Sequence, residues 1–311
     1  MAKTQSNQRA AYGEELVALG RENPNVVVLE ADLGKSTMSC LFQEAFPDRY
    51  FEMGIAEQNM MSTAAGLAAG GKIAFAGTFA VFAFGRAYDQ IRQTISIGEL
   101  NVKICGSSAG LSDFGDGATH QAIEDVAVMS AIPNMTVFTP CDATEARQAV
   151  RAAAALQGPA YIRVCRNPVT DCVGADSPFE PGKCRALRKG GDVALFAHGA
   201  MVGAAMDAAD ALEGAGVSAR VIGMPTMKPF DYAGVARLCE GMKAVVTAEE
   251  HTFIGGLASA VALALRGSGV PMDYAAIGDQ FGQSAGGAAE LMAFYGLTAG
   301  DIKAKVLALL R

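Results

Sequence analysis

Tryptophan is absent from this chain of 311 residues, histidine occurs only three times, and the seven cysteines form no recognisable pair. The cysteines are scattered, with no C-x-x-C spacing and no histidine at zinc-ligand spacing, which argues against a disulfide framework and a zinc site. We interpret them as reduced, mostly buried thiols. The chain is therefore not expected to depend on disulfides or on zinc.

Positive charge and long hydrophobic runs are also scarce. The formal net charge is −7 and the pI is about 5.1, so no basic stripe favours nucleic acid as a partner. Uncharged runs such as 58–71 and 252–265 are 14 residues long, short of the roughly 18 to 20 that a membrane helix needs. The first nine residues lack the apolar core of a signal peptide. We expect a cytoplasmic protein that binds neither nucleic acid nor membrane.

Small and apolar residues are abundant instead, with 51% hydrophobic residues and 36 glycines. The length exceeds that of a usual single domain and predicts two cores. In the first half, strand patterns alternate with helical patterns, which is typical of βαβ units and a parallel sheet. Strands are predicted over 25–30, 72–76, 101–106, 135–138 and 161–164, and helices over 11–22, 57–69, 82–97, 121–130 and 143–156.

The apolar periodicity fades between Asn167 and Lys183, and a second α/β series follows it. The predicted fold is therefore α/β with two doubly wound domains, the second smaller, spanning residues 1–170 and 188–311 around a linker at 171–187. In the second series, strands are predicted over 192–197, 218–222 and 243–247, and helices over 200–213, 257–265, 288–295 and 299–310.

The most informative stretch is 51–60, Phe-Glu-Met-Gly-Ile-Ala-Glu-Gln-Asn-Met, which ends in the first turn of a predicted helix. A carboxylate there favours the helix dipole, and taken alone Glu57 needs no other explanation. Other motifs follow it in order. They are Thr78-Phe-Ala-Val-Phe82, Tyr88-Asp-Gln90, Gly115-Asp-Gly-Ala-Thr-His-Gln121 and Pro140-Cys-Asp-Ala-Thr-Glu145.

With these motifs, residues 7–166 resemble the pyrimidine-binding domain of transketolase and deoxyxylulose-phosphate synthase. Thr247-Ala-Glu-Glu-His251 and Ile254-Gly-Gly256 resemble the C-terminal domain of the same family. The resemblance implies a thiamine-diphosphate enzyme that transfers a two-carbon ketol unit between sugar phosphates. The carbanion chemistry belongs to the cofactor, and the protein supplies orientation and electrostatics.

The resemblance makes Glu57 the leading catalytic residue, because its carboxyl group hydrogen-bonds the aminopyrimidine ring and favours the imino tautomer. Phe79 and, less firmly, Phe82 are implied to form the pocket against that ring, although both also suit a plain apolar core. Ile55 is implied to contact the cofactor, and Met53, Ile55 and Phe79 are expected to surround the carboxyl group with apolar side chains.

The glycine-rich loop that ends at His120 is implied to bind the substrate. In transketolases this histidine contacts the sugar phosphate and assists proton movements, and the neighbouring acid, here Asp116, contacts a sugar hydroxyl. Asp32 corresponds to an acid of the active site. Twelve residues before His120 the family carries a second histidine where this chain has Ser108, so an unusual ketose phosphate is a hypothesis.

The same resemblance assigns the substrate phosphate to Arg9, Ser36 and Arg166, since guanidinium and hydroxyl groups suit that anion. As isolated residues, all three are equally well explained as solvated loop positions.

The diphosphate-binding half of a full transketolase has no counterpart here. Gly115-Asp-Gly117 resembles the opening of the diphosphate-and-magnesium motif, but no matching asparagine pair follows about 25 to 30 residues later. The chain is expected to hold no metal itself. A separate N-terminal-half subunit is expected to hold Mg²⁺ or Ca²⁺ and the diphosphate, in an α2β2 assembly in which this chain also self-associates.

Three alternatives remain open at this point. The β subunit of a 2-oxoacid dehydrogenase shares the Ile-Ala-Glu-Gln run, but usually has a different loop before its histidine. Deoxyxylulose synthase is one longer chain with another domain arrangement. A non-catalytic scaffolding subunit of the same fold is the third, since fold does not guarantee function.

Overall fold

The central strands of the larger sheet are nearly continuous apolar runs, and helices bury them on both faces. The protein was analysed as a computed structural model that describes residues 4–311. Seven strands form this sheet in the order β12-β6-β7-β5-β4-β2-β3. All neighbours are parallel except β12, which pairs antiparallel with β6. The functional loops of such a sheet lie at the carboxyl ends of its strands.

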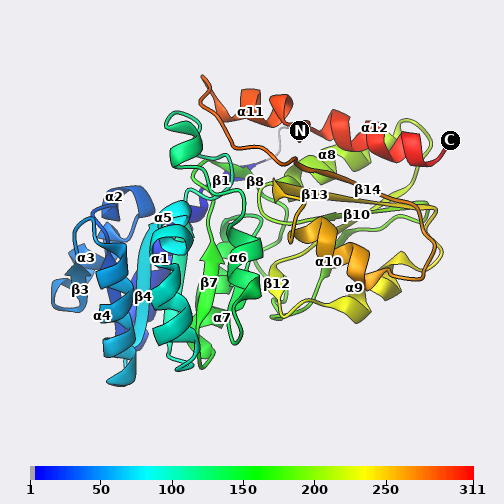
Figure 1. Ribbon diagram of the computed structural model, residues 1–311. Coiled ribbons are helices and arrows are strands. Elements are labelled where there is room, and N and C mark those ends of the chain that lie inside the picture. Colours follow the sequence, from blue (N-terminus) through cyan, green and yellow to red (C-terminus); the bar gives the residue numbers. More distant parts are fainter. Residues whose placement is uncertain (1–3) are drawn as a thin grey trace.

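The first part of the chain supplies six strands of this sheet and the helices around it (Figure 1). Its strands are β1 (Gln5–Ser6), β2 (Val26–Glu30), β3 (Tyr50–Glu52), β4 (Ile73–Phe79), β5 (Val102–Ser107), β6 (Thr136–Phe138), β7 (Ala160–Arg163) and β8 (Val169–Thr170). Its α-helices are α1 (Gln8–Glu22), α2 (Gly34–Thr37), α3 (Cys40–Ala45), α4 (Glu57–Ala69), α5 (Ala80–Arg86), α6 (Asp125–Ala131) and α7 (Ala143–Ala155). Shorter helical turns are η1 (Pro47–Arg49), the π-helix η2 (Gln90–Ser96) and η3 (Gly117–Thr119).

The second part forms a five-stranded sheet in the order β14-β13-β10-β11-β9, in which only β9 is antiparallel. The predicted α/β fold with two doubly wound domains is confirmed. The strands of this part of the chain, of which β12 joins the first sheet, are β9 (Arg185–Arg188), β10 (Val193–Ala197), β11 (Ala219–Gly223), β12 (Thr226–Lys228), β13 (Ala244–Thr252) and β14 (Met272–Ile277). The helices are α8 (Met201–Glu213), α9 (Tyr232–Cys239), α10 (Leu257–Ala264), α11 (Ala288–Phe294) and α12 (Ala299–Leu309).

Several details differ from the sequence prediction. The expected helix over 82–97 is two elements, because α5 ends at Arg86 and a π-helix begins at Gln90. The helix expected from Gln121 begins only at Asp125, since residues 110 and 122 form a backbone bridge. Strand β9 begins at Arg185, inside the segment predicted as a linker.

The two sheets are joined by one strand and by a shared apolar core. β12 crosses from the second part of the chain to the edge of the first sheet, where Thr226 lies opposite Phe138. One apolar cluster includes residues of both sheets, for example Val137 and Phe196. Within residues 4–311, no helix combines the length and apolarity that crossing a membrane requires.

Candidate active site

Glu57 is the first residue of α4 and lies directly after the left-handed turn at Gly54, where φ is 68°. Glu52 fixes this turn, because its Oε1 accepts hydrogen bonds from the backbone N–H groups of Asp32 at 2.7 Å and Gly54 at 3.0 Å. The Glu57 side chain is only 1% exposed. A carboxylate at a helix N-terminus gains from the helix dipole even where it is buried.

Arg86, at the end of α5, is the ion-pair partner of Glu57. Its Nη1 donates to both carboxylate oxygens at 3.0 Å, and its guanidinium lies 4.9 Å from the centre of the Phe82 ring. The expected surrounding of apolar side chains is therefore incomplete. Ile55 is 76% exposed, because it lies in the turn before α4 and points away from the core. A cation, not Ile55, contacts the carboxylate.

Phe79, Phe82 and His120 form an aromatic cluster near this ion pair. The two phenyl rings are nearly parallel, with centres 6.1 Å apart and planes 13° apart. The imidazole of His120 meets both edge-on, with ring centres 6.2 Å from Phe79 and 5.2 Å from Phe82. His120 Nδ1 lies 2.9 Å from the Thr119 hydroxyl. The structure thus brings together three residues that are up to 41 positions apart in sequence.

Two arginines lie near these residues, Arg166 beside Phe79 and Arg9 beside Ser36. The guanidinium of Arg166 is 6.0 Å from the Phe79 ring centre and forms a 2.7 Å ion pair with Asp113. Arg9 Nη1 donates to the backbone carbonyl of Ser36 at 2.7 Å. Burial lowers the pKa of Arg9, and the positive charge of Arg166 lowers it further. Two guanidinium groups that close together are a favourable place for an anion such as phosphate.

The remaining candidates lie at the ends of the neighbouring strands. Ser108 is fully buried, with φ of 53°, directly after the residue of β5 that pairs with Phe79. Asp32, also left-handed with φ of 62°, and Ser36 line a cavity of about 420 Å³ with Tyr50. Asp116 is exposed at the start of η3 and makes no ion pair within residues 4–311.

Three buried hydroxyl groups at this edge of the sheet have no hydrogen-bond partner within the described part of the chain. They belong to Thr78 in β4, Ser107 in β5 and Ser108. Unpartnered buried polar groups are uncommon in native proteins and call for an explanation such as a bound ligand. Beside the Glu57 carboxylate and the stacked rings, they fit a flat aromatic ring with a polar edge. An aminopyrimidine has that chemistry.

No group of three or more His, Cys, Asp or Glu side chains suited to a metal ion occurs within residues 4–311. The other two histidines lie in the second domain. His198 and His251 are fully buried, and burial lowers the pKa of His198 to about 3. Neither belongs to the cluster around Glu57.

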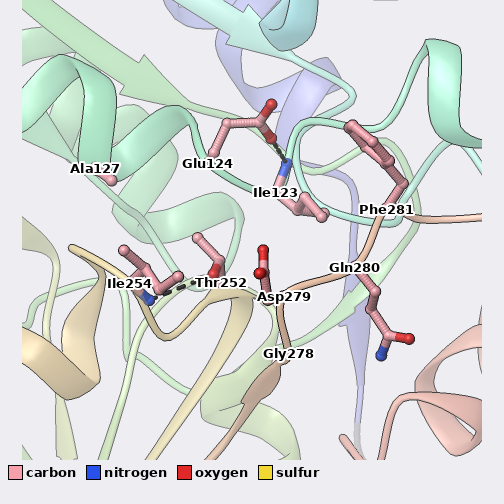
Figure 2. A pocket seen from close by; sticks show the side chains of 9 residues that line it. All are labelled: Ile123, Glu124, Ala127, Thr252, Ile254, Gly278, Asp279, Gln280 and Phe281. Atoms are coloured by element: carbon pink, nitrogen blue, oxygen red, sulfur yellow. Dashed lines mark hydrogen bonds between the residues drawn. The ribbon is translucent and has the colours of Figure 1, made fainter.

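A well-formed cleft of about 400 Å³ lies elsewhere, between α6 and the segment after β14. Figure 2 shows its walls, with Glu124 and Phe281 on one side and Thr252 and Ile254 on the other. None of the predicted site residues lines this cleft. The candidate site is instead an open edge of the first sheet.

Sequence reasoning missed two residues of the site. Arg86 follows Phe82 by four positions, and this helical spacing places its side chain over the ring, but no motif drew attention to it. Asp113 precedes the recognised glycine-rich motif by two residues, and only the structure reveals its pairing with Arg166.

The fold is that of a two-domain α/β protein, and the candidate site residues lie at the carboxyl ends of its parallel strands. Residues 5–170 match the family described as transketolase, pyrimidine binding domain, and residues 182–302 match the transketolase, C-terminal domain family. The chain belongs to the transketolase family.

Relatives extend this finding over nearly the whole chain. The putative transketolase C-terminal section of Methanocaldococcus jannaschii is 41% identical, over 96% of this chain and 95% of that protein. The 6-deoxy-6-sulfo-D-fructose transketolase subunit SqwH of Clostridium sp. is 40% identical, over 94% and 91%. Human transketolase is 34% identical over 93% of this chain, which spans only 46% of it.

A solved structure described as a split gene transketolase, inactive beta4 tetramer, has a TM-score of 0.90 to this chain. It is 48% identical, with 98% of each chain covered. The chain is thus a C-terminal subunit of the split transketolase type.

Proposed function

We propose that this chain supplies the pyrimidine-binding half of a thiamine-diphosphate site and acts with a separate subunit in ketol transfer between sugar phosphates. The observation that carries the proposal is the buried carboxylate of Glu57 beside the stacked Phe79 and Phe82 rings. When bound, the cofactor supplies the carbon nucleophile of the reaction.

The roles proposed for this chain come from the family resemblance and are supported by its geometry. Glu57 would hydrogen-bond the edge of the pyrimidine ring, while Phe79 and Phe82 would hold the ring in place. His120, edge-on to both rings, exchanges protons with substrate oxygens, and Asp116 accepts a hydrogen bond from a sugar hydroxyl. Arg9 and Arg166, with the Ser36 turn, bind the phosphate, and Asp32 lines the approach. Ile55, exposed in this chain, contacts the cofactor and the partner subunit.

The diphosphate and its metal ion, Mg²⁺ or Ca²⁺, are assigned to an N-terminal-half subunit. One finding supports this division, since a similar chain is described as an inactive tetramer of β subunits. We propose an α2β2 or larger assembly in which this chain also contacts itself.

The donor sugar is left open between common and unusual ketose phosphates. One relative is named for 6-deoxy-6-sulfo-D-fructose and another, 34% identical, for apulose-4-phosphate. Ser108 at the usual histidine position favours a donor other than xylulose 5-phosphate.

Reconstitution tests the proposal. The chain is mixed with its N-terminal-half subunit, thiamine diphosphate and Mg²⁺, and a panel of ketose phosphates is assayed with aldose acceptors. Turnover is expected only when both subunits are present. Full efficiency with xylulose 5-phosphate would exclude the unusual donor, and no transfer from any ketose phosphate would refute ketol transfer between sugar phosphates.

A further inference from the structure

The loop 110–121, which carries Asp113, Asp116 and His120, is held by both domains. In the first domain, Arg166 pairs with Asp113, and Asn167 donates to the carbonyl of Ser112. At its base, Gly110 and Ala122 exchange two backbone hydrogen bonds of 2.8 and 3.1 Å, which close the loop. Its anchors in the second domain come from β13 and from the segment after β14. The second domain therefore contacts the loop that we assign to the substrate.

Glu250, in β13, contacts the base of the loop. Its side chain is 4% exposed, and its Oε1 accepts a 2.7 Å hydrogen bond from the backbone N–H of Leu111. Gly110 has φ of 68°, and a Cβ atom there would lie 2.4 Å from the carboxyl carbon of Glu250. Only glycine allows this backbone angle and this close approach together.

Arg163 fixes the strand that carries Glu250. Its Nη2 donates to the backbone carbonyl of Glu250 at 2.9 Å, and its Nε donates to Asp125 at 3.0 Å. Arg163 is buried, so these bonds are formed away from water, where an unpaired partner would be costly. The Glu250 carboxyl group is thus held in one place relative to the first sheet.

The tip of the loop meets the segment after β14, which Figure 1 shows reaching from the second sheet toward the first. The backbone N–H of Ala285 donates to Phe114 O at 2.9 Å, and at the C-terminal end of the loop Gln121 Nε2 donates to Gln283 O at 3.0 Å. Gly117, with φ of 73°, leaves no room for a Cβ atom beside Ser284. Base and tip are both clamped by the second domain.

We propose that the second domain positions the substrate loop of the first, with Glu250 as the positioning residue at the loop base. The inference rests on the proposed function, because it gives the loop its role in binding sugar phosphate. Glu250 touches no reacting group in this account. It acts through Leu111 and the loop that follows.

The variants Glu250→Ala and Glu250→Gln separate positioning from general damage in the reconstituted complex. Alanine removes the bond to Leu111, so the KM for the donor is expected to rise about tenfold, with kcat and thiamine-diphosphate affinity within about twofold of wild type. Glutamine retains an accepting oxygen. Burial raises the pKa of Glu250 to about 7, so a neutral carboxamide is a mild change and should restore the KM. Glu240→Ala, an exposed acid of the same domain, is the control.

Hydrogen exchange provides a readout without turnover. In Glu250→Ala the amides of 111–121 are expected to exchange faster, while those of α8 and α12 are unchanged. An unaltered donor KM with unaltered loop exchange would overturn the proposal. So would an equal loss of protection across the whole second domain, which indicates a merely structural role.

Gln121→Ala keeps the proposal testable if Glu250→Ala does not fold. It removes the bond to Gln283 together with a 3.2 Å bond to the carbonyl of Asp113 within the loop. A rise in donor KM of about threefold or more is expected, because both hydrogen bonds are lost. An unchanged KM would contradict the clamp. If wild-type complex shows no ketol transfer at all, the proposed function fails, and exchange of the loop amides still decides whether Glu250 orders it.

Discussion

The residues around Glu57 show how much of this site depends on single side chains. Glu57, Phe79, Phe82 and His120 could be predicted from sequence, because each lies in a motif at a strand end or helix start. Arg86 could not, since its importance arises from the three-dimensional meeting of α4 and α5. The role of Glu250 was not predicted for the same reason, because Glu250 lies 139 positions from Leu111, whose backbone N–H it binds.

In the proposed site, Arg86 would compete with the cofactor ring for the Glu57 carboxylate and the Phe82 face. Replacing Arg86 with alanine is expected to tighten thiamine-diphosphate binding in the reconstituted complex by up to about fivefold. The gain is small because a half-exposed ion pair contributes roughly 1 kcal/mol or less. Calorimetric titration of thiamine diphosphate into the reconstituted complex measures the affinity, with Arg92→Ala as an exposed control. Weaker binding would indicate that Arg86 itself holds the cofactor.

Arg166 is predicted to recognise the phosphate of the substrate. Arg166→Ala should raise the KM for phosphorylated donors about tenfold or more, because a charge-assisted hydrogen bond is lost, and should leave a non-phosphorylated ketose unaffected. Steady-state kinetics with the matched pair of sugars checks this, and Arg147→Ala on the surface serves as control. An equal effect on both sugars would remove Arg166 from the phosphate site.

Among the elements, β2 ends in a carboxyl group that affects stability. Burial raises the pKa of Glu30 to about 7, while hydrogen bonds from Ser39 and Thr37, each 2.6 Å, oppose the rise. The folded state therefore holds a proton that the unfolded state releases near pH 4.5. Its stabilising contribution is full below that pH and is lost as pH rises through about 7.

Glu30→Gln is expected to flatten this dependence. Between pH 4.5 and 7.5, the wild-type free energy of unfolding should fall by about 3 kcal/mol more than that of the variant, the equivalent of the shift in pKa. Urea denaturation at several pH values measures the difference. Identical pH dependence in the two proteins would show that Glu30 is not the responsible group.

Asp142 caps the N-terminus of helix α7 and also binds the backbone at residues 172–173, which connect the two sheets. Asp142 Oδ1 accepts from the N–H of Glu145 at 2.9 Å, and its Oδ2 accepts from the N–H groups of Cys172 and Val173, each at 2.8 Å. Asp142→Ala is expected to lower the free energy of unfolding by about 3 kcal/mol, since it removes a helix cap and two buried bonds. Asp142→Asn should lose about half of that free energy, and Thr298→Ala, at a half-buried cap, about 1 kcal/mol. A loss from Asp142→Ala no larger than that of Thr298→Ala would contradict the dual role.

At the element scale, sequence patterns predicted the long buried strands and amphipathic helices well. Two strands without a long apolar run were missed. β3 has only three residues and includes an exposed acid, and β14 is an edge strand that includes Asp273 and the exposed Tyr274. The π-helix at Gln90–Ser96 has the same apolar pattern as an α-helix, so periodicity alone could not separate it from α5.

At the scale of the whole molecule, a buried carboxylate, a stacked aromatic pair and a pair of arginines lie at one sheet edge. The division of the cofactor site between two subunits is a prediction from sequence resemblance and remains a proposal. The contacts between the domains required coordinates, since they join segments more than 130 positions apart.

Activity of Glu57 variants in the reconstituted complex tests the central claim most directly. Ketol transfer by complexes containing Glu57→Ala and Glu57→Gln is measured beside wild type and the Glu240→Ala control, after assembly with the partner subunit has been verified by sedimentation. The account predicts assembly as in wild type and a loss in kcat of about 100-fold or more for both Glu57 variants. Full turnover by the assembled Glu57→Ala complex would contradict it.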